Sequence, residues 1–153
     1  MENCIFCKIV SGEMPSHTVF ENESHLAFLS IFPNTDGVTV VIPKQHNHSY
    51  VFANEQETVN ELMRISKIVA TKIDRAFEDV GRTGLIFEGF GVDHLHAKLY
   101  PMHGTGSMKE WKMIESSKPT EFFTTYQGYL SSHDCEIETE EKLVEIATKI
   151  RNA

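Results

Sequence analysis

The sequence has no run of apolar residues close to the ~18 that a membrane-spanning helix needs. Its N-terminal residues lack the basic and apolar regions of a signal peptide. Basic residues are in deficit: 14 Lys and Arg stand against 22 Asp and Glu, which argues against a general binder of nucleic acid or anionic membranes. We therefore expect a cytoplasmic protein whose partners include neither a membrane nor a nucleic acid polymer.

Cysteine is scarce as well. Three cysteines in 153 residues are an odd number and make a poor disulfide framework in the cytosol. A chain of this length buries a core without such staples. It has no internal repeat or linker-like segment, so we expect a single domain over residues 1–153. The acidic balance is compatible with a small phosphorylated ligand, because such a ligand needs only a local cluster of donors.

Three short extended runs, at residues 18–21, 25–31 and 38–42, are separated by polar turns and indicate an antiparallel meander. A long amphipathic helix follows, with apolar residues at three- and four-residue steps up to Phe77. Asn54 is its predicted cap, with Glu57 completing a capping box, and Gly81 is its predicted stop.

Two more extended runs, 84–88 and 94–101, complete an α+β pattern: an antiparallel sheet with helices mainly on one face. We place the core of the domain in residues 1–104 and a C-terminal extension in residues 105–153. Apolar spacing from about residue 139 predicts a final helix in that extension. The aromatic residues before that helix are expected to pack against the body or across a dimer interface.

The run that begins at residue 94 alternates between polar and apolar side chains. Alternation along a strand sends neighbouring side chains to opposite faces, about 6–7 Å apart on each face. It therefore puts two imidazoles and an ammonium on one face: His94, His96 and Lys98. A glycine-rich turn that includes Gly91 precedes them, and its backbone N–H groups are suited to bind an anion.

Four side chains are candidate ligands for a metal: Cys4, Cys7, His46 and His94. The two-residue gap between the cysteines lets both thiolates bind one tetrahedral Zn²⁺, and two histidines complete a closed structural site. His48 is an alternative to His46. A redox role for the cysteine pair is the weaker interpretation, because no strand precedes the pair and no helix clearly starts at it.

Together these residues resemble the histidine triad (HIT) superfamily. The likeness lies in four blocks in order: CIFCKIVSGEMPS from residue 4, LAFLSI from residue 26, VVIPKQH from residue 40 and VDHLHAKLYP from residue 92. The resemblance implies a five-stranded antiparallel sheet with one long helix packed on it, and a homodimer. It also implies hydrolysis or transfer at the α-phosphate of a nucleotide derivative.

Residue roles follow from the same resemblance. The middle histidine of the family's His-x-His-x-His motif attacks phosphorus, and that position is His96. The first position, His94, is a zinc ligand in zinc-bearing relatives, together with the cysteine pair and a histidine that matches His46. A neutral imidazole forms a covalent phosphoramidate that water then resolves. We expect a neighbouring cation to favour the neutral form of His96, and a backbone carbonyl to hold its other ring nitrogen.

The sequence departs from the family at several positions. Lys98 replaces the third histidine, where it can clamp a phosphate as a point charge. Ser30 replaces the acidic residue that holds the ribose, while Phe90 and Gly91 replace the polar residues before the triad. His103, just after the strand, is a candidate substitute proton donor. The candidate substrate-binding residues are therefore Ser30, Gly91, Lys98 and His103.

Three functions compete. The first is a nucleotide phosphoester or phosphoramidate hydrolase, or a nucleotidyl transferase, with His96 and Lys98 as catalytic residues. The second is a zinc-stapled homodimer that binds a nucleotide or phosphate with impaired catalysis, suggested by the missing ribose and phosphate contacts. The third is a dimeric scaffold that acts through its C-terminal third, for which the unexplained aromatic residues are the only support.

Overall fold

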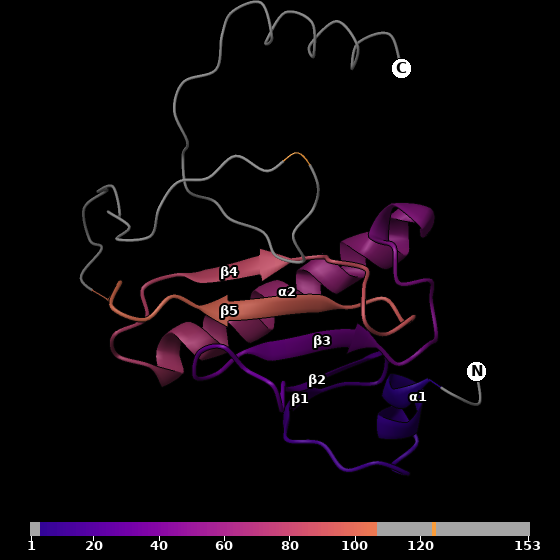
Figure 1. Cartoon of the computed structure of the whole chain (residues 1–153), viewed down its shortest axis with the longest axis horizontal. Coiled ribbons are helices and arrows are strands. Elements are labelled where there is room, and N and C mark those ends of the chain that lie inside the picture. The colour runs from indigo at the N-terminus through magenta and orange to yellow at the C-terminus, as the bar shows by residue number, and fades with distance from the viewer. Residues whose placement is uncertain (1–3, 107–123, 125–153) are drawn as a thin grey trace, which may run out of the picture. The chain divides into compact units, whose positions relative to one another are not determined.

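The computed structural model describes residues 4–106 and residue 124 (Figure 1). The helical elements are α1 (Ile5–Val10), the short 3-10 turn η1 (Val51–Ala53) and α2 (Gln56–Ala76). The strands are β1 (Thr18–Glu21), β2 (His25–Leu29), β3 (Thr39–Pro43), β4 (Thr83–Ile86) and β5 (Ala97–Pro101). None of the helices among these residues combines the length and apolar character that crossing a bilayer requires.

The five strands form one antiparallel sheet in the order β1-β2-β3-β5-β4 (Figure 1). The predicted α+β class, the meander of the first three strands and the five-stranded sheet with one long helix are thus confirmed. The final strand is shorter than predicted, because β5 begins at Ala97 and residues 94–96 lead into it. There Leu95 donates its N–H to the carbonyl of Asn47 at 2.9 Å.

The predicted ends of the long helix are wrong. Glu55 is the N-cap of α2, and no side chain caps the helix. The amide of Asn54 instead donates to the carbonyls of His48 and Tyr50, both at 2.8 Å, so it closes the preceding turn. The helix ends at Ala76, well before Gly81, because the backbone of Phe77 turns extended and its ring packs against the core.

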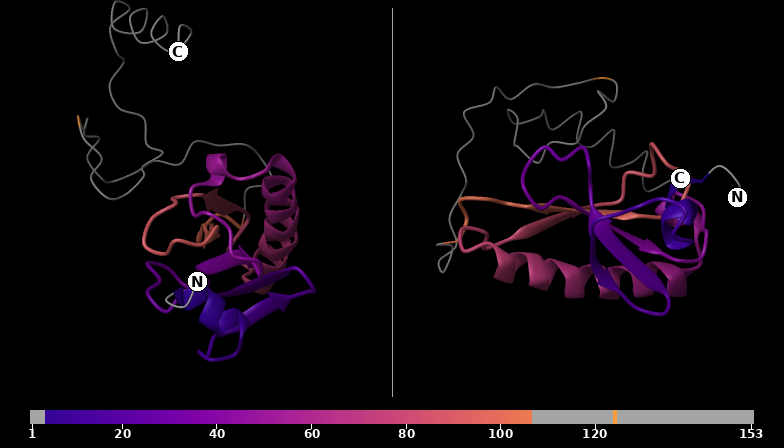
Figure 2. Two further views of the ribbon diagram at one scale, coloured as in Figure 1. Left: turned by 90° about the vertical axis from the view of Figure 1, so that its right-hand side faces the viewer. Right: turned by 90° about the horizontal axis from the view of Figure 1, so that it is seen from below.

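Helix α2 covers one face of the sheet (Figure 2). The apolar side of the helix and the inward side chains of the sheet form one buried cluster: Ala27, Val41, Val51, Leu62, Ile65, Val69, Ile73, Leu95, Ala97 and Leu99. The alternation predicted for the last strand is confirmed here, since Leu95, Ala97 and Leu99 all point into this core. Burial of this apolar area is the main force that holds helix and sheet together.

The opposite face of the sheet carries α1. Phe6, Ile9 and Val10 of this helix pack on a second buried cluster made by Leu26, Phe28, Val40 and Ile42. In the pairing of β3 with β5, Val40 stands directly opposite Lys98. Lys98 therefore lies on the face of the sheet that carries α1 and not on the face that carries α2.

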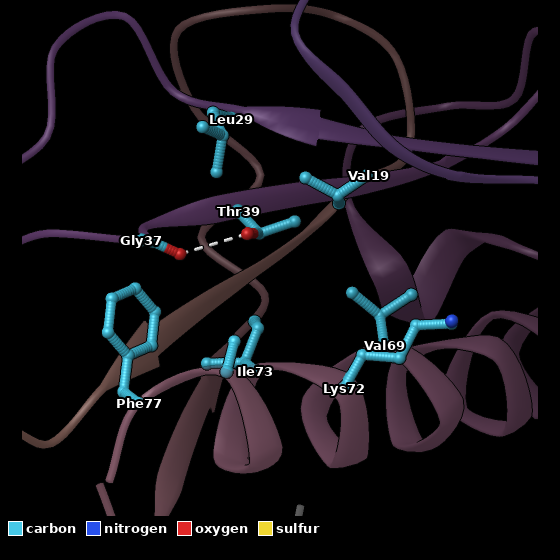
Figure 3. A pocket seen from close by; sticks show the side chains of 9 residues that line it. Val19, Leu29, Gly37, Thr39, Val69, Lys72, Ile73 and Phe77 are labelled. Atoms are coloured by element: carbon cyan, nitrogen blue, oxygen red, sulfur yellow. Dashed lines mark hydrogen bonds between the residues drawn. The ribbon is translucent and has the colours of Figure 1, made fainter. Parts of the chain in front are cut away.

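An apolar cavity of about 260 Å³ lies on the α2 side (Figure 3). It is lined from the sheet by Val19, Leu29 and Thr39, and from the helix side by Ile73 and Phe77. It lies across the sheet from Lys98, because Lys98 is on the face that carries α1. The predicted C-terminal helix and most of the aromatic segment lie outside the described residues. The predicted extension at residues 105–153 therefore stays a prediction.

Candidate functional site

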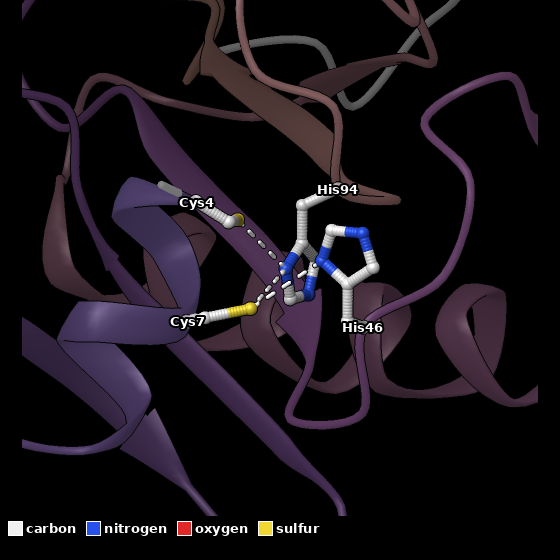
Figure 4. Close-up of side chains that lie close together, drawn as sticks. All are labelled: Cys4, Cys7, His46 and His94. Atoms are coloured by element: carbon white, nitrogen blue, oxygen red, sulfur yellow. Dashed lines mark hydrogen bonds between the residues drawn. The ribbon is translucent and has the colours of Figure 1, made fainter. Parts of the chain in front are cut away.

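Four side chains meet where the start of α1 faces the segment that leads into β5 (Figure 4). One ligand atom from each of Cys4, Cys7, His46 and His94 lies within 4.8 Å of every other. His94 Nδ1 is 3.5 Å from Cys4 Sγ and 3.6 Å from Cys7 Sγ, and His46 Nδ1 is 3.3 Å from Cys7 Sγ. The structure thus brings together all four predicted ligands.

These separations suit a tetrahedral metal ion. Zn–S bonds of about 2.3 Å and Zn–N bonds of about 2.0 Å place sulfur and nitrogen about 3.5 Å apart at the edges of a tetrahedron. Burial raises the pKa of Cys7 above its ordinary value of 9.0, and the hydrogen bond and charge of Cys4 raise it further. A bound cation would reverse this effect and hold both sulfurs as thiolates.

The imidazole of His94 is fixed in the tautomer that a metal ligand needs. Its Nε2 lies 2.8 Å from the carbonyl of Pro43, and because a carbonyl only accepts, Nε2 carries the proton. Nδ1 is then unprotonated and faces the two sulfurs. Burial lowers the pKa of His94, which is fully buried, although the hydrogen bond to Pro43 acts in the opposite direction. The neutral ring is therefore favoured.

The loop that carries His46 is held by two hydrogen bonds to the segment before β5. The carbonyl of Asn47 accepts from Leu95 at 2.9 Å, and the carboxylate of Asp93 accepts from the N–H of Ser49 at 3.1 Å. Asp93 is exposed, and the hydrogen bond from Ser49 lowers its pKa. His48 lies outside the four-residue cluster, and its Nδ1 accepts from the N–H of Tyr50.

The cysteine pair does start a helix, contrary to the sequence analysis. Cys4 is the N-cap of α1, and the N–H of Lys8 donates to its carbonyl at 3.1 Å. One turn of helix places Cys7 beside Cys4. Each sulfur is within 3.6 Å of an imidazole nitrogen, so the pair is part of a mixed sulfur and nitrogen cluster.

His96 lies next to this cluster with its own ring fixed. Its Nδ1 donates to the carbonyl of His94 at 2.7 Å, which confirms the expected backbone partner and leaves Nε2 unprotonated. The ring meets the edge of Phe6 at a centroid distance of 5.5 Å, and only 2% of the residue is exposed. The pKa of His96 lies below its ordinary value, chiefly because the ring is buried. The positive charge of Lys98 lowers this pKa further, while the hydrogen bond to His94 and the charge of Glu88 act in the opposite direction.

Nε2 is the ring nitrogen of His96 that can act as a nucleophile. Since Nδ1 carries the proton of the neutral ring, Nε2 keeps its lone pair, which is the form in which an imidazole acts as a nucleophile.

Lys98 follows on the same face, and its ammonium is paired. Nζ donates to the carboxylate of Glu88 at 2.6 Å, and both side chains are partly buried. Glu88 comes just after β4, which is the neighbour of β5 in the sheet. The cation expected beside His96 is therefore present, with a carboxylate bound to it.

The remaining predicted residues are spread out. Gly91 is exposed in the turn before His94, with a φ of +82° and open space beside its Cα. Ser30 lies just past β2, where its Oγ accepts from the N–H of Phe32 at 3.2 Å. The structure keeps His103 away from His96, because the five residues of β5, about 16 Å of extended chain, lie between them. The His103 ring binds instead to the Asp79 carboxylate at 3.0 Å.

Two residues of the site, Phe6 and Glu88, were not predicted from the sequence. Phe6 packs edge-on against both His94 and His96, at centroid distances of 5.8 and 5.5 Å. Its position between the two cysteines was the available signal. Glu88 escaped because its pairing with Lys98 depends on the register of two strands, in which Ile86 stands opposite Lys98.

Comparisons with known proteins support the family resemblance. A sequence model of the HIT domain family matches residues 11–104. The adenosine 5'-monophosphoramidase hnt1 of Schizosaccharomyces pombe is 32% identical over 99 residues, which cover 65% of this chain and 74% of that protein.

Two solved structures have the same fold. A HIT family protein from Bacillus anthracis matches with a TM-score of 0.66 and 30% identity, over 99% of this chain and 96% of that one. A Zn-bound histidine triad family protein from Mycobacterium smegmatis matches with a TM-score of 0.62 and 26% identity, over 75% of this chain and 85% of that one.

Proposed function

The chain belongs to the HIT domain family, and from this premise we propose that it hydrolyses a nucleotide phosphoester or phosphoramidate, or transfers its nucleotidyl group, through a covalent intermediate on His96. The observation that carries the proposal is the 2.7 Å hydrogen bond from His96 Nδ1 to the His94 carbonyl. It fixes the tautomer in which Nε2 has its lone pair available. The activity printed for the Schizosaccharomyces pombe relative supports the same class of substrate.

The chemistry follows from that tautomer. The Nε2 lone pair attacks phosphorus, a P–N bond forms, and the bond to the leaving group breaks as that group takes a proton from water. The ring keeps its Nδ1 proton and becomes cationic, and the His94 carbonyl stabilises this charge through the same hydrogen bond. A second water then attacks phosphorus, the P–N bond breaks, and its electron pair returns to Nε2. The proton that this water loses neutralises the hydroxide left by the first step.

Zn²⁺ is the metal we propose for the cluster of Cys4, Cys7, His46 and His94. Four protein ligands fill a tetrahedral site and leave no position for substrate, so the ion has a structural role. It would tie α1 and the loop of His46 to the backbone segment that presents His96. The Zn-bound relative from Mycobacterium smegmatis supports this assignment.

Lys98, Gly91 and Ser30 are the residues we propose for binding the substrate. Lys98 stands beside His96, and Gly91 offers backbone in an exposed turn. The geometry does not support His103 as proton donor, because it lies beyond the far end of β5. A homodimer, a nucleotide ligand and a cytoplasmic location complete the proposal, and light scattering on the purified protein tests the first.

Turnover assays test the enzyme directly. The substrates are adenosine 5'-phosphoramidate and dinucleoside polyphosphates, and the proteins are the wild type, His96→Ala and the control His48→Ala. We expect turnover by the wild type and the control, and at least a thousandfold loss in His96→Ala. Equal rates in all three, or no turnover across the panel, would remove the proposal.

The second candidate is a binding module that has lost catalysis. It is favoured by one observation: the third position of the triad holds an ammonium paired with Glu88 where the family has an imidazole. This candidate predicts a thermal shift with nucleoside monophosphate and no product formation. A covalent phosphate adduct on His96 would refute it.

A further inference from the structure

Glu88 and Lys98 form an ion pair on the face of the sheet where we propose that the phosphoryl group binds. The carboxylate is 2.6 Å from Lys98 Nζ, and the exposed fractions of the two side chains are 19% and 31%. In the register of β4 with β5, Ile86 stands opposite Lys98, so Glu88 lies two residues further on and reaches back. Partial burial makes such a pair less screened than one on the open surface.

The position of Glu88 is fixed by the residue that follows it. Gly89 has a φ of +70°, a conformation that side chains other than glycine rarely adopt. A Cβ at Gly89 would stand 3.4 Å from the carbonyl oxygen of Ser49 and from the Cα of Tyr50. The turn therefore lies next to the loop beyond His46, and the left-handed φ of Gly89 sets the direction in which the chain leaves Glu88.

The ion pair of Glu88 and Lys98 changes the electrostatic environment of a substrate beside His96. Lys98 stands where the family has an imidazole, which is neutral at pH 7 when buried, so it adds one positive charge. The Glu88 carboxylate adds one negative charge 2.6 Å away. Lys98 lies two residues from His96 on the same face, about 6–7 Å along the chain, so both charges lie within electrostatic reach of the attacking nitrogen. The negative charge of Glu88 offsets the positive charge of Lys98.

We propose that Glu88 is a specificity-determining residue: by offsetting the charge of Lys98, it makes the site favour phosphoryl groups with one negative charge over terminal phosphates with two. This inference rests on the proposed function. Phosphodiesters and phosphoramidates belong to the first class. A nucleoside monophosphate belongs to the second, with a charge of about −1.5 to −2 at pH 7. Glu88 thereby also weakens the hold on the product of hydrolysis.

An ordinary structural pair is the alternative. A cross-strand ion pair that only fastens the end of β4 to β5 would affect thermal stability and leave the choice between ligands unchanged. The chain offers a matched control, because Glu21 accepts from Lys44 at the same distance of 2.6 Å. Glu21→Gln removes one negative charge from a Lys–Glu pair of equal length on the opposite edge strand.

The experiment compares the dissociation constants of AMP and of its 5'-methyl phosphodiester at pH 7.5, by calorimetry on the full metal-loaded chain. We expect Glu88→Gln to favour AMP over the diester by about five- to tenfold relative to the wild type. Glu21→Gln should leave the ratio unchanged. Glu88→Asp keeps the charge and should keep the wild-type ratio, and Glu88→Gln with Lys98→Gln restores neutrality and should return to it.

A ratio within twofold of the wild type in folded Glu88→Gln, or an equal shift in Glu21→Gln, would overturn the inference. Because binding is measured, the result separates from catalysis. A shifted ratio without turnover of any substrate would contradict the hydrolase and leave the inference standing. Turnover that depends on His96, together with an unchanged ratio of dissociation constants, would support the hydrolase and overturn the inference about Glu88. If neither AMP nor the diester binds the wild type, the proposed function and the inference about Glu88 both fail.

Discussion

The imidazole of His96 donates its Nδ1 proton to the backbone carbonyl of His94 at 2.7 Å, while the ring of His94 turns the other way toward two cysteine sulfurs. One residue thus supplies a metal ligand through its side chain and the orienting acceptor for the nucleophile through its backbone. Any change that moves the backbone at His94 must therefore affect both the metal cluster and His96.

Metal content is the first prediction. The purified chain should hold one equivalent of zinc, and Cys7→Ser should lose it because a thiolate ligand and its charge are removed. Atomic absorption measures the stoichiometry, and Cys135→Ser is the control that should retain the metal. Chelation of the wild type should lower its melting temperature. Wild-type protein that is metal-free when purified without chelator, and that takes up no added zinc, would contradict the assignment.

Phe6 gives a prediction about packing. Phe6→Ala removes a half-buried ring from contact with Phe28, His94 and His96, at a cost of about 2–3 kcal/mol in the free energy of unfolding. Phe6→Leu, which keeps most of the apolar volume, should cost less than half as much. Urea unfolding measures both. A change below about 0.5 kcal/mol in Phe6→Ala would show that the ring does not support the histidines.

The hydrogen bond between Asp93 and Ser49 predicts an effect on the metal at a distance. Asp93→Ala removes the acceptor that holds the loop of His46, so zinc should bind about tenfold more weakly. Competition with a chromophoric chelator measures the affinity. The control is Asp74→Ala, whose carboxylate binds Thr83 away from the cluster. Equal affinities in the two variants would mean that the loop holds its shape without Asp93.

The pair of His103 and Asp79 predicts how stability depends on pH. Hydrogen bonds to the Asp36 carbonyl and to Asp79 raise the pKa of His103 above 6.5, and the hydrogen bond from His103 lowers that of Asp79 below 3.8. The stabilisation from His103 is thus present below about pH 6.5 and is lost as pH rises through its raised pKa. The contribution of Asp79 is present above about pH 3.8 and is lost in acid.

Melting temperatures of the wild type and His103→Gln should therefore differ most between about pH 4 and 6.5 and least near pH 9. His17→Gln, on an exposed side chain, is the matched control. A difference that is constant across this range, or that grows toward high pH, would show that the pair is not charged in the folded protein.

The local pattern of the sequence was enough to predict the parts of the fold that depend on periodicity. Alternation placed Leu95 in the core and Lys98 on the other face, because a strand has a period of two residues. The helix boundaries were missed because they depend on contacts outside the helix. Asn54 serves the preceding turn, and the ring of Phe77 packs into the core and against His103 at a centroid distance of 5.0 Å.

The candidate site likewise contains residues that were predictable from the sequence and residues that were not. The spacing of Cys4 and Cys7 and the order of the family blocks were enough to predict four side chains that the fold brings together. The partner of Lys98 was not predictable from local pattern, because Glu88 reaches it only through the register of β4 with β5. Helix α1 has six residues, too few for a periodic signal to identify it.

A covalent adduct on His96 is the most direct test of the central claim. The full chain is mixed with adenosine 5'-phosphoramidate, quenched under alkaline denaturing conditions within the first turnover, and analysed by peptide mass spectrometry. We expect a nucleotidyl group on the peptide that contains His96 in the wild type and in His48→Ala, and none in His96→Ala. Turnover with the adduct on another residue, or His96→Ala turning over at the wild-type rate, would contradict the account.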